Sequence, residues 1–308
     1  MLSMSDNNPL NSPPLLVALL TLAQKAQPPF AHWLLKQADR LRGGIIPLSD
    51  EQRKMIANLK VVFGDNMTEK QYKATALRCF YLRSQALYDF FHFVKDKQSL
   101  RDRIHLTDGA KAMINYLKNT NSGAVAVSPH FVGADIAGME LAQHIKNAQA
   151  LSIPNPSRSY KNENMIRAAY GVRVTPASTR AMQTAMQTIR DGGLVAGSTD
   201  RANPEEEYTV PFFGKPARLP TVYIRLAIRL QVPVFHFTGV MSDDYQYTLD
   251  ASEPFFAESY PNRQDETVNN LQKVLVHTEN AIRKHPEQWC MFHPVWQNHI
   301  NTTERENS

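Results

Sequence analysis

The sequence predicts an α/β fold: a layered α/β/α sandwich with a central, mostly parallel or mixed sheet and a helical N-terminal subdomain. Two observations support this. From about residue 107 onward, short apolar strand patterns alternate with helical patterns, and such alternation requires a sheet with helices on both faces. Before that point the chain reads as helical. With 308 residues and 43% hydrophobic composition, the chain can fill one large core.

The first 43 residues predict a segment that lies against a membrane surface. A start rich in Asn, Ser and Pro precedes an apolar run over 15–23, and a mixed stretch containing Trp33 follows Pro28-Pro29. The run is too short to cross about 30 Å of hydrocarbon, and no basic residue precedes it as in a secretory signal. Residues 1–60 carry seven Lys or Arg against four acids. We expect an amphipathic hairpin in the interface of an anionic leaflet; a hairpin buried against the domain is the alternative.

These boundaries divide the chain into three parts. We expect residues 1–43 to form the disordered start and the hairpin, 44–300 to form a single domain, and 301–308 to form a disordered tail. No linker separates two cores within 44–300.

Individual elements follow from local signals. Thr68 and Gln71 form a capping box that opens a helix reaching about Val94, and its broad apolar stripe is typical of a core-facing helix. The other expected elements, in chain order, are a helix over 107–118, a strand over 124–127, a helix after residue 130, a strand over 150–153, a helix over 161–170, strands over 172–174 and 194–197 flanking a helix over 178–190, a strand over 210–213, a helix over 221–230, a hairpin of 232–240 with 245–250, and a helix over 265–284 that ends at His285-Pro286.

Composition excludes several classes of protein. Cys79 and Cys290 are far apart in sequence, with no Cys/His cluster, so neither a disulfide framework nor a zinc site is expected. A reducing, cytoplasmic setting is the simplest fit, with Cys79 as core packing. The net charge is +5, but the basic residues form no recognisable nucleic-acid-binding module. Nucleic acid is therefore not an expected partner.

His130 and Asp135 are the strongest candidates for chemistry. They follow the apolar run 124–127 at a predicted strand-to-helix corner. A nearly neutral imidazole can take the proton of an attacking hydroxyl, and a carboxylate can fix its tautomer and stabilise the imidazolium. The alternative is a loop histidine followed by a helix-capping aspartate.

Other predicted loops should converge on His130, because ligands of open α/β sheets bind beyond the carboxyl ends of the strands. The segment 156–167 carries Arg158, Asn162 and Arg167, which suit a phosphate or an oxyanion. Asp200 follows a strand and is either a site acid or a turn residue, and the acidic run 205–207 reads as solvated. In 210–218, adjacent aromatics can line an apolar tunnel, and Gly214 permits close backbone approach.

Taken in order, these motifs resemble the bacterial lipid A late acyltransferases and their relatives. The likeness covers roughly residues 45–297. It rests on strand-then-His-x4-acid, then Arg158, Asn162, Arg167 and Gly171, then Gly192-Gly193 and Asp200, then Val210-Pro211-Phe212-Phe213-Gly214, and finally Pro286-Glu287-Gln288-Trp289. Three features depart from the pattern. The acid is Asp135 where members acting on lipid A often have Glu, a full membrane-spanning helix is not found at the start, and 292–296 lacks basic residues common there.

The resemblance implies transfer of a fatty acyl chain from acyl carrier protein or coenzyme A to a hydroxyl of a membrane lipid. It places this peripheral enzyme at the cytoplasmic face of the bacterial inner membrane, with His130 and Asp135 as the catalytic pair. By the same likeness, Arg158 and Arg167 help bind lipid phosphate or the reacting carbonyl, with Asn162 beside them, and Asp200, Phe213 and Gly214 shape the site.

Several alternatives stay open at this point. The acceptor is lipid A-type, or a glycolipid, aminolipid or polyene lipid. A thioester hydrolase and a non-catalytic peripheral lipid-binding protein are the other functional classes. We expect no cofactor, metal or covalent acyl-enzyme, because bringing thioester and hydroxyl together does much of the work. An acidic carrier protein would dock on Lys215, Arg218 or the helix around Arg180 and Arg190.

Overall fold

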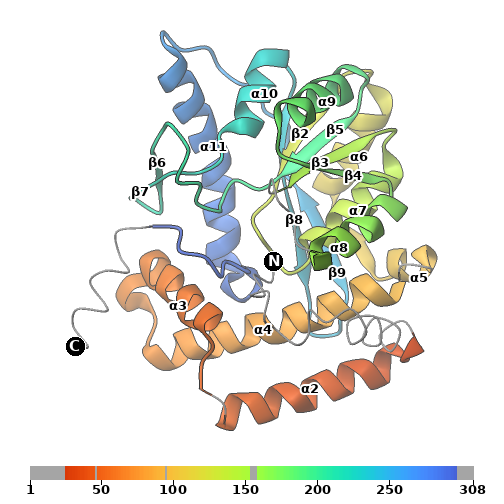
Figure 1. Ribbon diagram of the computed structural model, residues 1–308, viewed down its shortest axis with the longest axis vertical. Coiled ribbons are helices and arrows are strands. Elements are labelled where there is room, and N and C mark those ends of the chain that lie inside the picture. The colour runs from red at the N-terminus through yellow and green to blue at the C-terminus, as the bar shows by residue number, and fades with distance from the viewer. Residues whose placement is uncertain (1–24, 46, 94–95, 153–157, 297–308) are drawn as a thin grey trace.

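A seven-stranded sheet forms the centre of the computed structural model, which describes residues 25–45, 47–93, 96–152 and 158–296, without the side chains of 38–45, 158 and 159. The order is β1-β9-β8-β2-β5-β3-β4, and neighbours are parallel except β8 and β9. This confirms the predicted fold class (Figure 1). The strands are β1 (Ile104–Leu106), β2 (Ala124–Val127), β3 (Ala148–Ser152), β4 (Val172–Pro176), β5 (Leu194–Gly197), β8 (Val234–Met241) and β9 (Tyr247–Ala251).

Helices cover both faces of the sheet, as the alternating pattern predicts. On one face lie α6 (Asp108–Asn119) and α7 (Ala134–His144); on the other lie α9 (Thr179–Arg190), α10 (Val222–Leu230) and α11 (Arg263–Lys284) (Figure 1). Along β2, alternate side chains enter the two cores: Val125 and Val127 face α10, and Ala124 and Ala126 face α6 and α7. Because Ala124 and Ala126 have small side chains, α6 and α7 can approach the sheet closely. α8 (Arg158–Ala169) connects β3 to β4.

The N-terminal helices pack across the lower end of the sheet in Figure 1. They are α2 (Pro28–Ile45), α3 (Asp50–Phe63), α4 (Glu69–His92) and the short α5 (Lys97–Arg101). Thr68 and Gln71 form the predicted capping box, and α3 starts with a similar box at Ser49. Among the described helices, none is long and apolar enough to cross a bilayer.

α2 is fixed to the domain through a buried aspartate. His32 on α2 approaches Asp89 of α4 with an Nε2–Oδ1 distance of 3.1 Å. The Tyr247 hydroxyl of β9 donates to the other oxygen of Asp89 at 2.8 Å, and both acid and imidazole are buried. The first arm of the expected hairpin, the disordered start and the tail lie outside the described residues, so α2 is the part of that prediction that can be placed.

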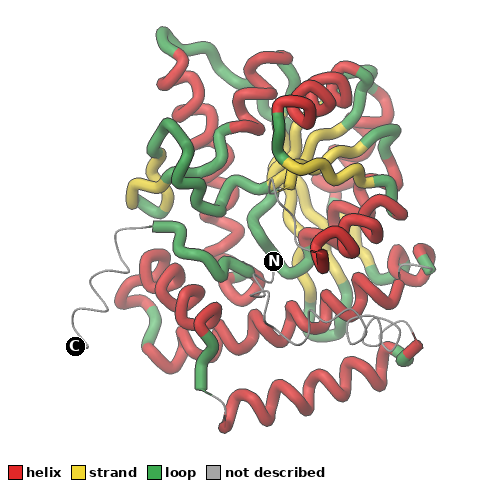
Figure 2. The backbone as a smooth tube through the Cα atoms, in the orientation of Figure 1, coloured by secondary structure: helices red, strands yellow, loops and turns green. Residues whose placement is uncertain are grey.

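A small hairpin stands apart from the main sheet (Figure 2). β6 (Val210–Phe212) pairs antiparallel with β7 (Lys215–Ala217). The sequence predicted β6, but it predicted neither β7 nor β1. Phe213 and Gly214 form the two-residue turn, with φ of +50° and +70°. Positive φ at both positions is the geometry of a tight hairpin turn, which explains the glycine. The expectation that Gly214 lets a ligand approach the backbone stays a prediction.

The contact between β8 and the start of α7 leaves no space for a side chain. A Cβ at Gly239 would lie 2.3 Å from the carbonyl oxygen of Gly133. We predict that Gly239→Ala lowers the free energy of unfolding by about 1–3 kcal/mol, because backbone must shift to relieve the overlap. Gly138→Ala is the matched control in α7, where a Cβ meets nothing within 4 Å; helix propensity predicts a gain of about 0.5–1 kcal/mol. Urea unfolding of both variants checks this, and equal stabilities would contradict it.

Candidate active site

His130 and Asp200 meet because their strands are neighbours. β2 and β5 are paired in parallel with Val127 opposite Gly197, and each of the two residues lies three positions beyond its strand end. The imidazole Nδ1 lies 2.6 Å from Asp200 Oδ1. The pair therefore forms at the carboxyl edge of the sheet, where ligands of α/β folds bind.

Asp200 is held by three different groups. Besides the imidazole, its Oδ2 accepts the backbone N–H of His130 and the indole N–H of Trp289, both at 2.8 Å. The carboxylate is fully buried. Burial alone would raise the pKa of Asp200, but the His130 imidazole and the hydrogen bonds outweigh it and hold the pKa below its usual value. The group therefore stays ionised and keeps a hydrogen on Nδ1.

This arrangement leaves the other imidazole nitrogen facing the cavity. With Nδ1 donating to Asp200, Nε2 carries a lone pair, and the Ser198 hydroxyl oxygen lies 3.3 Å from it. The imidazole is 28% exposed, so a substrate can reach it. Sequence reasoning missed Ser198; the signal was a hydroxyl between a strand end and an acid.

Asp135 does not hold His130, and this part of the sequence prediction is wrong. Its carboxylate receives a forked pair of hydrogen bonds from Arg167 of α8, Nε to Oδ1 at 2.7 Å and Nη2 to Oδ2 at 2.8 Å. Asp135 opens α7 and its side chain is 49% exposed. Desolvation by the cavity walls opposes ionisation, but Arg167 outweighs it and lowers the pKa of Asp135. His130 and Asp135 line the same cavity with different partners.

Arg167 is more constrained than the sequence suggested. It also donates to Asn164 at 2.7 Å and Glu163 at 3.2 Å, and its guanidinium lies over the rings of Phe90 and Tyr160. Such a set of partners fixes the guanidinium as part of the cavity wall. The two forked hydrogen bonds of the guanidinium go to the Asp135 carboxylate, whereas the sequence analysis assigned them to a phosphate or an oxyanion.

Of the other predicted site residues, Asn162, Phe213 and Gly214 do not line the cavity of His130. Asn162 lies on α8 but not on the cavity wall. Arg158 starts α8, and its side chain lies outside the described residues. Phe213 packs on Trp289, with ring centroids 6.5 Å apart, so the turn supports the indole that binds Asp200. Phe213 thus contacts the site through this indole, and neither Phe213 nor Gly214 lines the cavity.

Two further predictions need comment. Glu206 is not simply solvated, because it accepts hydrogen bonds from the backbone and hydroxyl of Thr221 at 3.1 and 2.8 Å. Cys79 is buried in the core as expected. Although distant in sequence, its sulfur lies 3.7 Å from that of Cys290, which borders the cavity. Among the described residues, no cluster of His, Cys, Asp or Glu could hold a metal ion.

The cavity beside His130 has a volume of about 760 Å³ and mainly apolar walls. Its polar lining includes His130, Ser198, Arg201, Tyr160 and Arg167. A largely apolar site with polar groups beside the imidazole suits an amphipathic substrate. The apolar wall includes Phe90, Ile136, Met139, Leu151, Val172, Val174, Ala196 and Tyr223.

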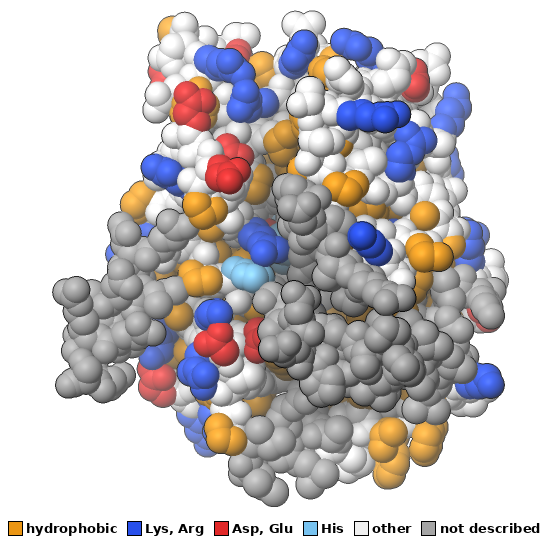
Figure 3. All heavy atoms as spheres, viewed as in Figure 1, with side chains coloured by type: hydrophobic (Ala, Val, Ile, Leu, Met, Phe, Trp, Pro, Cys, Tyr) orange, Lys and Arg blue, Asp and Glu red, His pale blue; other side chains and the backbone are white. Residues whose placement is uncertain are grey.

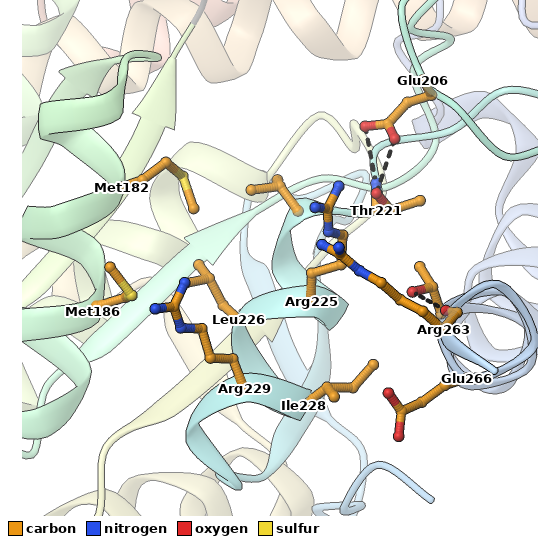
Figure 4. Close-up of a pocket in the computed structure, with 12 residues that line it drawn as sticks. Met182, Met186, Glu206, Thr221, Arg225, Leu226, Ile228, Arg229, Arg263 and Glu266 are labelled. Carbon is orange, nitrogen blue, oxygen red and sulfur yellow. Dashed lines mark hydrogen bonds between the residues drawn. The ribbon is translucent and has the colours of Figure 1, made fainter. Parts of the chain in front are cut away.

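A second cavity, of about 500 Å³, lies between α9, α10 and α11 (Figure 4). Arg225, Arg229 and Arg263 line it together with Met182 and Met186. It shares part of its wall, including Met182, with the cavity of His130. Glu206 and Glu266 also line it, so its charge is mixed.

The depressed pKa of Asp200 predicts a measurable pH effect on stability. Its ionised form stabilises the fold above the ordinary aspartate pKa of about 4, and this contribution is lost as pH falls through the lower folded-state value. In the wild type, the free energy of unfolding should fall as the pH drops below about 5. We expect this slope to be smaller in Asp200→Asn, by up to about 1.4 kcal/mol per pH unit, because the variant lacks the titrating carboxylate. Urea unfolding at several pH values measures this, with exposed Asp108→Asn as control. An unchanged acid slope in Asp200→Asn would count against the assignment.

Comparison with known proteins identifies the family to which the chain belongs. None of the curated proteins matches the chain. The family model described as bacterial lipid A biosynthesis acyltransferase matches residues 17–298. That match includes every element of the sheet, both ends of the His130–Asp200 pair and Trp289. The chain therefore belongs to the bacterial lipid A biosynthesis acyltransferase family.

Proposed function

We propose that this acyltransferase moves a fatty acyl chain from a thioester to a hydroxyl of a membrane lipid, with a lipid A-type acceptor favoured by the family. The observation that carries the proposal is the His130–Asp200 pair, whose imidazole Nε2 borders a largely apolar cavity. The polar groups suit the reacting centre, and the apolar walls suit the acyl tail.

In the proposed reaction, His130 Nε2 removes the proton of the attacking hydroxyl. Asp200 keeps the imidazole in the required tautomer and stabilises the imidazolium that forms. The same imidazolium then protonates the sulfur of the leaving thiol. Arg201 follows Asp200 in sequence and lines the cavity, so we assign it the contact with the carbonyl oxygen as negative charge develops. Arg167, tied to Asp135, instead keeps α7 and α8 together at the cavity wall.

The donor is acyl carrier protein or acyl-coenzyme A. An acidic carrier would meet basic side chains over α9 and α10, where Arg180, Arg190, Arg225 and Arg229 are exposed. Lysine and arginine side chains are frequent over this upper part of the molecule (Figure 3). Lys215 and Arg218 are also exposed, and Arg218 donates to the carbonyl of Pro204. Turnover compared between the two donor types at equal concentration distinguishes them.

The proposed location is the cytoplasmic face of the bacterial inner membrane, with peripheral attachment through α2. Phe30, Trp33 and Leu34 on this helix are 50–59% exposed, while Ala31 and His32 face the domain. Lys36 is exposed beside them. An exposed aromatic and aliphatic face with adjacent cations is typical of interfacial helices on anionic lipid. Apolar side chains project at the bottom of Figure 3, where α2 lies.

Thioester hydrolysis is a second candidate function, favoured by one observation. Hydrogen bonds join Ser198 to His130 and His130 to Asp200, which is the order of the catalytic groups in serine hydrolases. A labelled acyl thioester incubated with a total lipid extract separates the candidates: label enters lipid for a transferase, becomes free fatty acid for a hydrolase, and stays in the thioester for a lipid-binding protein. The lipid that takes the label also identifies the acceptor, including a glycolipid, aminolipid or polyene lipid.

Substitution of the His130–Asp200 pair should remove activity. We expect His130→Ala to abolish transfer, because it removes the base that takes the hydroxyl proton. Asp200→Asn should lower kcat on the order of a hundredfold or more, because the imidazole loses its tautomer control. Initial rates with saturating donor and lipid measure both. Near-normal turnover in either variant would contradict the mechanism, provided that circular dichroism shows a native fold.

Asp135 should act through Arg167. We expect Asp135→Asn and Arg167→Ala each to reduce transfer, because each breaks the forked pair that joins α7 to α8. The double variant should lose little more than the worse single variant, since both changes remove the same interaction. A multiplicative loss in the double-mutant cycle would show that Asp135 works independently of Arg167.

The exposed face of α2 should determine membrane binding. We expect the triple change Phe30→Ser, Trp33→Ser and Leu34→Ser to weaken binding to anionic vesicles at least about tenfold, because each large apolar side chain contributes on the order of 1.5–3 kcal/mol when buried. Vesicle co-sedimentation measures it. Phe256→Ser is the matched control, since Phe256 is 57% exposed elsewhere in the fold. Equal loss in the control would show a non-specific effect.

A further inference from the structure

Three arginines on two helices line the second cavity. They are Arg225 and Arg229 on α10 and Arg263 at the start of α11. Among the residues that the structure describes, none of the three guanidinium groups donates a hydrogen bond or forms an ion pair. Arg225 and Arg263 point toward one another across the cavity (Figure 4). Like charges that face each other repel, and an anion bound between them would remove this repulsion.

The two acids of the cavity do not neutralise these arginines. Glu206 is held by Thr221, which donates to it from its backbone N–H and from its hydroxyl. The carboxylate of Glu266 lies away from the guanidinium groups of Arg225 and Arg263 in Figure 4. Within the described part of the chain, no ion pair joins either acid to an arginine of the cavity. The cavity therefore presents cationic hydrogen-bond donors to a ligand.

The second cavity adjoins the cavity of His130 through the first turn of α10. Val222 lines both cavities, as does Met182 of α9. The next residue of α10, Tyr223, lines the cavity of His130 and packs on Gly197 at the end of β5, where a Cβ would lie 1.8 Å from the tyrosine hydroxyl oxygen. An elongated ligand bound at the imidazole would pass along this shared wall to the arginines.

We propose that these arginines bind the phosphate group of the phosphopantetheine arm on which the acyl donor carries its thioester. The inference rests on the acyl transfer proposed above and adds a second contact for the donor, far from the reacting carbonyl. Acyl carrier protein and coenzyme A both have this arm, so the site would serve either donor. A phosphate ester stays ionised at neutral pH, and the forked hydrogen bonds of guanidinium groups match its oxygens.

The apolar side of the cavity matches the same ligand. Next to its phosphate, the arm has a quaternary carbon with two methyl groups, and a chain with two amides then leads to the sulfur. Met182 and Met186 of α9 and Leu226 of α10 lie beside the arginines (Figure 4). Flexible apolar side chains such as methionine can pack on these methyl groups. Inorganic phosphate would contact the cations and leave this apolar wall uncovered.

Donors that differ in one phosphate test the site. The full-length protein transfers a lauroyl group to a total lipid extract from lauroyl-phosphopantetheine or from lauroyl-pantetheine, which lacks the phosphate. We expect the wild-type KM to be at least about tenfold higher for lauroyl-pantetheine, because charge-assisted hydrogen bonds are lost. The double variant Arg225→Ala/Arg263→Ala should have the same high KM for both donors, with kcat and the KM of the lipid unchanged.

Arg173→Ala is the matched control, because Arg173 is exposed on β4 and lines neither cavity. It should keep the wild-type difference between the two donors. Equal wild-type KM values for the two donors would overturn the inference. So would a double variant that raises the KM of the lipid and not that of the donor, because the arginines would then bind a lipid phosphate.

Calorimetric binding of coenzyme A separates this inference from the proposed function, because it needs no turnover. If the wild type binds coenzyme A at least about tenfold more tightly than the double variant but no label reaches lipid, the phosphate site stands and acyl transfer fails. If both proteins bind coenzyme A equally while label still reaches lipid, the phosphate site is overturned and acyl transfer stands. Thermal unfolding of the double variant should match wild type, since both arginines are exposed.

Discussion

The carboxylate of Asp200 is the constraint on which the site depends. It is buried, and it joins three parts of the chain: the loop after β2 through His130, its own loop after β5, and the C-terminal segment through Trp289. A buried charge is stable only when such partners satisfy it. The same bonds that make its burial tolerable also orient the imidazole. The C-terminal segment is fastened further by Cys290, whose N–H donates to the His130 carbonyl at 2.7 Å.

Much of the fold, and the reacting histidine, could be predicted from the sequence. The helix and strand patterns after residue 107 placed most elements within a few residues, because alternation of buried strands and amphipathic helices is a local signal. The partner of His130 is not local. Asp135 is close in sequence, but Asp200 lies at the same offset beyond a neighbouring strand. Only the strand order, with β5 inserted between β2 and β3, reveals that Asp200 is the nearer acid.

The remaining differences have the same origin. Asp135 and Arg167 read as two separate site groups, whereas α7 and α8 bring them together as one ion pair. The adjacent aromatics Phe212 and Phe213 suggested a tunnel wall, but Phe213 lies in the hairpin turn and packs on Trp289. The two cysteines become neighbours only because α4 packs beside the C-terminal segment. In each case a residue type was recognised correctly, and a long-range contact decided what it does.

The attachment of α2 has a consequence for how the enzyme would sit on lipid. His32 and Asp89 connect this helix to α4, and Tyr247 continues the connection into the sheet that carries the reacting loops. A truncation up to residue 43 would leave Asp89 without its imidazole partner, so the proposed anchor is also part of the scaffold. With Phe30 and Trp33 embedded, the rigid linkage would hold the cavity mouth at a constant height above the bilayer. Only lipids whose hydroxyl protrudes to that level could be acylated.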